Sequence, residues 1–305
     1  MAPCPACGGE PSPWITVPAG EPSDHRSFEL WRCPACGTAV TAGPPPGPEA
    51  YEQGIYSPGS ARPAAARLLQ RLTVGQPARA LARAGLRPGA RVLDVGAGRG
   101  RLVAELRRRG YAASGIDVSE RSVAQAAEAG LDVARRSIDD HHDSGLDAVV
   151  LWHVAEHLDN PLAALDRVRG WLMPRGLVLL GVPNAASLQA RIAGPSWMHW
   201  DAPRHRVHLT PAGVTALLHR AGLEPVHTEQ MVWEHNPAAM WMALLSRAGV
   251  SPAYAFHALK GNAPRGGRDL ALTLAGLPLL APAVLAEAGA AARGRGGTLI
   301  AVARA

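Results

Sequence analysis

The sequence predicts an α/β fold with a doubly wound, mostly parallel sheet, preceded by a small cysteine-rich module. Strand-like apolar segments alternate with helical segments from residue 63 onwards, which is typical of parallel sheets covered by helices. A Gly-rich turn directly follows the first of these strands. All four cysteines fall within the first 36 residues, as two matched pairs. A chain of 305 residues is long enough for one large domain plus such a module.

The cysteines predict a structural zinc site. Each pair is a CxxC sequence followed by Gly, and this spacing lets both sulfurs of a pair reach one ion while the Gly permits a tight turn. Four thiolates fill a tetrahedral site and leave no open position for chemistry. The alternatives are two disulfides, which a reducing compartment disfavours, and unrelated thiols, which the absence of any further cysteine disfavours. The expected ligands are Cys4, Cys7, Cys33 and Cys36.

Short strands are expected over residues 14–17 and 27–32, between the two CxxC turns, which we call knuckles. Two knuckles joined by such strands fit a zinc ribbon. The run over residues 43–48 contains only Gly and Pro and reads as a stiff linker. The expected organisation is a zinc ribbon over residues 1–42, a linker and aromatic gate segment over 43–62, and the main domain over 63–305, with a helical insertion over 236–295.

The main domain opens with an apolar strand over residues 90–95, which runs into the turn Gly96-Ala97-Gly98. A second strand, over residues 112–117, ends in Asp117. This acid lies 21 positions after Gly96, close to the ~20 expected of a carboxylate that binds a ribose. The full GxGxxG spacing of a dinucleotide site is lacking, which disfavours a dehydrogenase.

With Asp94 inside the first strand, the pattern resembles motif I of class I S-adenosylmethionine (SAM) methyltransferases. The resemblance implies a seven-stranded Rossmann-like sheet, with later strands near residues 132–136, 146–153, 176–184, 225–233 and 297–304. It also implies that Asp94 helps hold the SAM amino group, that Asp117 holds the ribose, and that an aromatic residue near the linker folds over SAM. The implied cofactor-binding residues are Tyr56, Asp94, Gly96, Ala97, Gly98, Asp117, Val118, Ile138, Asp139 and Trp152.

A first polar cluster follows the fourth strand and resembles the "LEH…P" signature of small-molecule methyltransferases. His153, Glu156 and His157 are spaced i, i+3, i+4, so a helical turn places them on one face. They suit a general base, or a divalent metal site like that of ubiquinone-pathway O-methyltransferases. His153 stands where that acidic pattern has a carboxylate, which weakens the expectation of magnesium. The alternative is that Glu156 and His157 only brace the turn.

A second cluster lies after the fifth strand, over residues 197–211, and is expected to form a lid over the acceptor. Its tryptophans supply apolar walls, and Arg204 could hold an acidic group. Thr210 and Pro211 read as the start of the next helix. The alternative is a structural loop in which Asp201 pairs with Arg204. The predicted substrate-binding residues are Trp197, Trp200 and Arg204; the predicted catalytic residues are His153, Glu156, His205 and His208.

These features predict a SAM-dependent methyltransferase that acts at oxygen or carbon of a small molecule. One alternative is an RNA methyltransferase whose zinc ribbon reads the RNA, and another is a non-catalytic SAM-fold scaffold. The net charge of +6 does not favour nucleic acid, because the positive residues are scattered and the segment between the knuckles is not strongly basic. The intact Asp94, Gly96, Gly98 and Asp117 set argues against a scaffold.

The insertion over residues 236–295 is apolar and helix-prone. It could wall an apolar acceptor pocket, form a homodimer face or touch a membrane surface; if it lines the pocket, the acceptor is apolar with an anionic group. The uncharged stretch over residues 270–286 is shorter than the ~20 residues of a membrane span and contains Pro278 and Pro282. The start of the chain lacks the pattern of a signal peptide, so a cytoplasmic location is expected.

Overall fold

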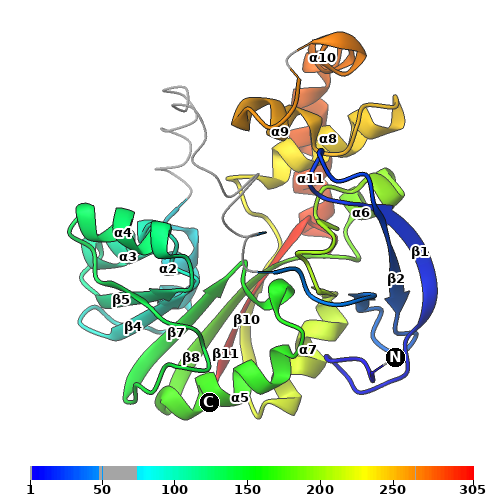
Figure 1. The fold of residues 1–305 in the computed structure, drawn as a ribbon. Coiled ribbons are helices and arrows are strands. Elements are labelled where there is room, and N and C mark those ends of the chain that lie inside the picture. Colours follow the sequence, from blue (N-terminus) through cyan, green and yellow to red (C-terminus); the bar gives the residue numbers. More distant parts are fainter. Residues whose placement is uncertain (1, 48–49, 51–73, 265) are drawn as a thin grey trace.

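The computed structural model of the protein describes residues 2–47, 50, 74–264 and 266–305 (Figure 1). The strands are β1 (Ser12–Pro18), β2 (Ser27–Arg32), β3 (Ala39–Thr41), β4 (Arg91–Val95), β5 (Ala112–Asp117), β6 (Val133–Arg135), β7 (Leu146–Trp152), β8 (Leu172–Pro183), β9 (Val207–His208), β10 (Glu224–Glu229) and β11 (Thr298–Arg304). The helices are α2 (Gln76–Arg83), α3 (Arg101–Arg108), α4 (Glu120–Glu128), α5 (Pro161–Trp171), α6 (Leu188–Ala193), α7 (Pro211–Arg220), α8 (Asn236–Arg247), α9 (Tyr254–Lys260), α10 (Gly267–Ala275) and α11 (Leu280–Ala292), with short 3-10 turns η3 (Ala155–His157), η4 (Gly194–Ser196) and η5 (Leu277–Leu279).

The central sheet has seven strands in the order β10-β11-β8-β7-β4-β5-β6. The pairs from β8 to β6 are all parallel, and β11 runs antiparallel to both of its neighbours. The strand order reverses beside β4, so the carboxyl ends of β4 and β7 flank a crevice, where doubly wound sheets bind ligands. The predicted fold class is therefore confirmed.

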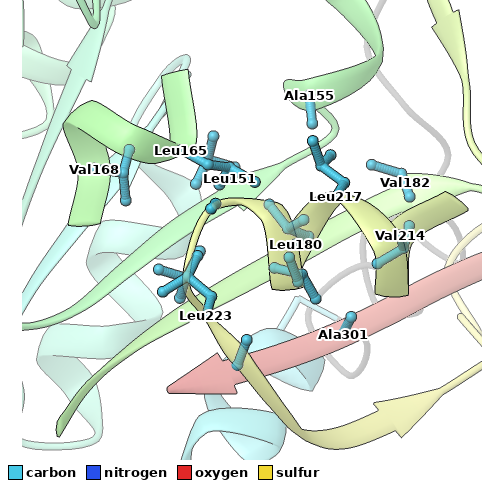
Figure 2. Close-up of a cluster of buried hydrophobic side chains, with 14 of the residues drawn as sticks. Leu151, Ala155, Leu165, Val168, Leu180, Val182, Val214, Leu217, Leu223 and Ala301 are labelled. Carbon is cyan, nitrogen blue, oxygen red and sulfur yellow. The ribbon is translucent and has the colours of Figure 1, made fainter. Parts of the chain in front are cut away.

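Apolar side chains cover both faces of this sheet, because strands buried on both sides read as continuous apolar runs. One face packs against α5 and α7, and Figure 2 shows Leu151 and Leu180 of the sheet meeting Leu165 and Leu217 of these helices. The other face packs against α2 and α3, with residues such as Leu106. The two layers of helices hold the strands rigid, so the loops at the strand ends have a fixed base.

The N-terminal module shares a second sheet with the main domain. Its strands β1, β2 and β3 form antiparallel pairs, and β3 pairs in turn with β9, which lies in the segment expected to be a lid. Figure 1 shows the module, in blue, on the side of the molecule away from α2, α3 and α4. This pairing joins parts of the chain more than 160 residues apart, for example Ala39 and His208.

Helices α8 to α11 form the segment between β10 and β11, in agreement with the expected helical insertion, and gather at one end of the molecule (Figure 1). Glu287 of α11 is fully buried and accepts hydrogen bonds from Gly297 N (2.7 Å), Asn236 Nδ2 (2.8 Å) and Gln189 Nε2 (2.7 Å). These bonds attach the helices to the loop before β11 and to α6. Within the described part of the chain, no single helix is long and apolar enough to cross a membrane, although α10 and η5–α11 together, bent by 49°, have the length and composition.

Candidate active site

The Gly-rich turn after β4 lies across the end of β5. Gly96 and Ala97 both donate backbone hydrogen bonds to Ile116 O, and Gly96 has a φ of 69°, which favours glycine. A Cβ on Gly96 would lie 2.5 Å from Val154 Cγ2, so this turn touches the loop after β7. A Cβ on Gly98 would meet nothing within 4 Å, so the turn borders open space. A ligand can therefore approach this backbone closely.

Two carboxylates flank the turn. Asp94 is 3% exposed, and burial together with the charge of Asp117 raises its pKa to about 8. Asp117 accepts hydrogen bonds from Gly98 N (2.7 Å) and Ser119 N (2.8 Å), one to each oxygen. A carboxylate has about four acceptor positions, so Asp117 keeps positions for two hydroxyl donors. A buried acid with a raised pKa is stabilised by a cation, and SAM carries both an ammonium and a sulfonium.

Four further predicted cofactor residues follow or end these strands. Val118 follows Asp117 and is 60% exposed. Ile138 and Asp139 follow β6, where Asp139 pairs with Arg167 at 3.0 Å. Trp152 ends β7 and is half-buried. Tyr56 lies outside the described residues.

His153 and Glu156 form a hydrogen-bonded pair after β7. His153 Nδ1 lies 2.9 Å from Glu156 Oε1, and a carboxylate only accepts, so Nδ1 carries the hydrogen. His153 Nε2 then holds a lone pair, and it is buried with no hydrogen-bond partner in the described part of the chain. The backbone of His153 is left-handed, with a φ of 56°, a strained conformation that clusters at functional sites.

Burial alone would raise the pKa of Glu156, but the hydrogen bond from His153 and the neighbouring His157 and His205 lower it to about 2. One atom each from Glu156, His157 and His205 lies within 4.8 Å of the others. His157 Nδ1 donates to Arg204 O and His205 Nδ1 donates to His199 O, so both Nε2 atoms carry lone pairs. This group is able to bind a divalent ion, with His205 in the place that sequence reasoning gave to His153.

Two further imidazoles beside His153 were not predicted as site residues. His235 lies 5.1 Å from His153, and His199 lies 5.9 Å from His235, between ring centroids. Burial, followed by the charges of His153 and His205, lowers the pKa of His199 to about 3; burial and His153 hold the pKa of His235 well below its usual range. Both rings are therefore neutral at neutral pH, and they act as walls rather than strong bases. His199 stood within the second cluster, whereas nothing in the sequence near His235 indicated a site.

The two tryptophans predicted to bind substrate are buried behind the histidines of the site. Trp197 and Trp200 are 2% exposed and pack with Val17 and Leu30 of the ribbon. Trp200 Nε1 donates to Gly194 O at 2.8 Å. Their rings contact histidines of the site, Trp197 meeting His199 and Trp200 meeting His208. They support the histidines from behind instead of forming an open wall.

Arg204 is 5% exposed and is held between two carboxylates. Its guanidinium pairs with Asp201 and lies 3.2 Å from Glu21 of the ribbon. The pairing of Arg204 with Asp201 is the structural alternative raised from the sequence. Since its charge is already neutralised, Arg204 is poorly placed to bind an acidic group of a substrate, and that role stays a prediction that this geometry does not favour.

His208 is attached to the ribbon. The Thr41 hydroxyl donates to His205 O (2.6 Å), so His208 Nε2, 2.9 Å from Thr41 Oγ1, donates to that hydroxyl. Burial and His205 hold the pKa of His208 well below its usual range. Thr41 N also donates to Arg206 O. His208 is thus a weaker candidate for a base than His153.

The four cysteines of the ribbon come together. Cys4 Sγ lies 3.7 Å from Cys36 Sγ, Cys7 Sγ lies 3.5 Å from Cys33 Sγ, and all four sulfurs are within 4.8 Å of one another. Sulfurs placed tetrahedrally at ~2.3 Å from zinc are about 3.8 Å apart, so the spacing fits that ion. Burial raises the pKa of the Cys4 thiol to about 12, so a thiolate there needs a cation beside it.

The structure has a cavity of about 520 Å³ at the amino-terminal ends of the strands, around Arg87, Asp147 and Arg175. This cavity therefore lies at the opposite end of the strands from His153 and the Gly-rich turn, which follow the carboxyl ends of β7 and β4. A second cavity lies between the ribbon and α6, with Trp14, Trp200 and Arg295 in its lining.

Comparisons with known proteins agree with this geometry. Residues 66–228 match the family model described as "Methyltransferase domain", which is more than half of the chain. "Ubiquinone biosynthesis O-methyltransferase" of Dinoroseobacter shibae is 30% identical over 173 residues, covering 52% of this chain and 69% of that protein. The protein of the same name from Cereibacter sphaeroides strain ATCC 17025 is 32% identical over 180 residues, covering 54% and 72%.

Two solved structures show the same fold. A Galdieria sulphuraria protein described as a sarcosine dimethylglycine methyltransferase has a TM-score of 0.51 at 15% identity, and covers 83% of this chain and 93% of its own. A chain from the complex of the Haloferax volcanii Trm112 methyltransferase activator with a methyltransferase has a TM-score of 0.52 at 17% identity, and covers 81% and 99%. At these identities the likeness concerns the fold alone.

Proposed function

The chain belongs to the methyltransferase-domain family and is a SAM-dependent methyltransferase, and from this premise we propose that it methylates an acidic hydroxyl group of a small molecule. The observation that carries the proposal is the pair His153 and Glu156, with a buried Nε2 lone pair on a residue whose chain neighbour, Val154, touches the Gly-rich turn. A phenolic hydroxyl, with an ordinary pKa of ~10, is acidic enough for an imidazole to deprotonate it. The curated relatives are named O-methyltransferases, which also supports oxygen as the acceptor.

When bound, SAM supplies a methyl group on a sulfonium and leaves as S-adenosylhomocysteine. Asp94 would face the positive charge of its amino group, and Asp117 would accept hydrogen bonds from the ribose. The chain's part is to hold the acceptor oxygen against the methyl group, because reacting atoms need to be about 3–3.5 Å apart. His153 Nε2 takes the hydroxyl proton as the new carbon–oxygen bond forms.

Glu156 positions His153. Its carboxylate holds the Nδ1–H tautomer and stabilises the imidazolium that forms, as a carboxylate does in other histidine pairs. The segment that carries His199, His205 and His208 closes the other side and excludes water. His199 of this segment and His235 support this role: His235 lies 5.1 Å from His153, His199 lies 5.9 Å from His235, and burial lowers the pKa of both rings, so that neither competes for the proton.

The Cys4, Cys7, Cys33 and Cys36 cluster is proposed to bind one structural Zn²⁺. Its function is to hold the ribbon, and with it β3, against β9. Metal analysis of the purified chain is expected to find one zinc per chain, and Cys4→Ser with Cys36→Ser to lose it. Zinc retained by this double variant would contradict the assignment.

The catalytic proposal is tested with His153→Asn. Asn tolerates the left-handed backbone and still donates to Glu156, but it cannot accept the proton. With SAM and 3,4-dihydroxybenzoate as a probe, mass spectrometry of the native chain is expected to show a product heavier by one methylene. The variant is expected to lose about 10²–10⁴-fold in kcat while its Kd for SAM changes less than about twofold.

His142→Asn, which changes an exposed histidine, is the control and is expected to keep both values. A His153→Asn variant that retains full kcat would exclude His153 as the base. If the native chain methylates carbon or nitrogen acceptors and leaves the hydroxyl probe unmethylated, oxygen is excluded as the acceptor.

A further inference from the structure

The cavity between the ribbon and α6 is separate from the methyl-transfer site. Its volume is about 490 Å³, within the range of small-molecule sites. Trp14 and Arg32 of the ribbon, the segment over residues 185–191 and the segment over residues 293–295 line it. Trp200 of the proposed lid also lines the cavity, and its ring contacts His208.

The lining is strongly basic. It contains four arginines, and none of the described residues that line the cavity is acidic. All four arginines are exposed, and the side chains of Arg191 and Arg295 form no hydrogen bond or ion pair with the described residues, although their backbones do. Their guanidinium groups are therefore available for a ligand. The arginines are Arg32, Arg191, Arg293 and Arg295.

The cavity also has an aromatic platform. Trp14 is 40% exposed, whereas most tryptophans of the site are buried. Arg32 packs over its ring, with the guanidinium carbon 5.0 Å from the ring centroid, and the ring of Trp200 meets it at about a right angle, with the ring centroids 5.6 Å apart. A fixed, partly exposed indole is suited to stack against a flat ring.

The geometry points to a second ligand site in this cavity, for a nucleotide-like molecule that combines a phosphate group with a flat ring. Arginine binds phosphate through two parallel hydrogen bonds, and Arg191 and Arg295 come from different segments, so they can grip it from two directions. Trp14 takes the ring. This site is independent of the methyl-transfer chemistry, because neither His153 nor the Gly-rich turn lines the cavity.

The probe is GDP, titrated into the full-length, zinc-loaded chain with SAM at saturation, so that the SAM site is occupied. Tryptophan fluorescence and calorimetry are expected to show one saturable site with a Kd below about 1 mM. Guanosine, which lacks phosphate, and pyrophosphate, which lacks the ring, are each expected to bind at least about tenfold more weakly.

The variant Arg191→Gln with Arg295→Gln is expected to weaken GDP binding at least about tenfold, and Trp14→Leu to weaken it as well. The control, Arg121→Gln with Arg247→Gln, removes two exposed arginines elsewhere and is expected to bind as the native chain does. Absence of saturable binding, equal binding of guanosine, or an affinity that the double variant shares with its control would each overturn the proposal. An RNA oligonucleotide that binds far more tightly than GDP through these residues would overturn it in favour of nucleic acid.

Discussion

Asp94 combines two properties that oppose each other: a buried position and a proposed function, the binding of SAM, that needs negative charge. Its pKa of about 8 means that the carboxyl holds its proton at neutral pH when no cation lies beside it. In the proposed complex the ammonium of SAM would lie beside this carboxyl and lower its pKa. We therefore expect binding to expel the proton, and the affinity for SAM to depend on pH.

The expected result is release of nearly one proton per SAM bound at about pH 7, and an affinity that rises up to about tenfold between about pH 6 and about pH 7. Calorimetry in two buffers of different ionisation enthalpy measures the release. Asp94→Asn is expected to release none, while Asp166→Asn, at an exposed position on α5, is the control. Equal proton release by Asp94→Asn and its control would mean that another group titrates.

The histidines of the site differ in their hydrogen-bond partners and in their pKa values, and these differences indicate which of them can act as a base. His153 has an acid beside one nitrogen and no partner in the described part of the chain at the other. His208 instead donates to Thr41, and burial lowers the pKa of His199 to about 3. A base needs an unpaired lone pair and a stabilised cationic form, and of these three only His153 has both among the described residues.

At the scale of elements, the pairing of β3 with β9 links the ribbon to the proposed lid. Thr41 makes three hydrogen bonds across this junction, to the segment over residues 205–208. Thr41→Val keeps the shape and the backbone bonds but removes the hydroxyl. The variant is expected to lose about 1–3 kcal/mol of unfolding free energy and to lower kcat more than it weakens SAM binding.

Denaturant unfolding and steady-state kinetics test this. Thr16→Val changes an exposed threonine of β1 in the same module and is the matched control. If Thr41→Val weakens SAM binding and kcat to the same extent, the junction supports the whole domain and not the lid in particular.

Local patterns predicted β4, β5 and β7 almost to the residue, because a short apolar run with a turn signal is read from neighbouring positions. The helix start at Thr210 was predicted for the same reason, and its hydroxyl accepts from Gly213 N. In contrast, β9 has only two residues and its partner β3 lies far away in the chain. No local signal marks such a pairing.

The same distinction applies to the site. The Gly-rich turn and the His153 cluster follow from motif and spacing. His235 enters the site only because the chain after β10 folds back toward β7, and this is a property of the tertiary structure. The choice between a substrate-binding Arg204 and its pairing with Asp201 also depended on the third partner, Glu21, which lies 183 positions earlier.

At the scale of the whole molecule, Glu287 fastens the helices α8 to α11 to the sheet. It meets three donors, and a glutamine there would turn an NH2 group toward one of them. Glu287→Gln is expected to cost about 1–3 kcal/mol of unfolding free energy. Backbone hydrogen exchange is expected to accelerate in α8 and α11 together, because Asn236 of α8 and residue 287 of α11 belong to the same hydrogen-bond network.

Glu128→Gln, at an exposed position on α4, is the control and is expected to leave exchange unchanged. Faster exchange in α11 alone, with α8 protected as before, would show that the apolar contacts around Met240 and not the carboxylate hold α8 in place.

The shared sheet of ribbon and lid has a consequence for engineering and for descent. β9 pairs with β3 of the ribbon, so the lid segment cannot be transferred alone to a relative that lacks the ribbon. The backbone groups of β9 that pair with β3 would then be unpaired, and an unpaired strand edge is prone to aggregate. We therefore expect the ribbon and the lid segment to be inherited together as a pair that sets the acceptor preference, with substitutions on β3 accompanied by compensating substitutions on β9.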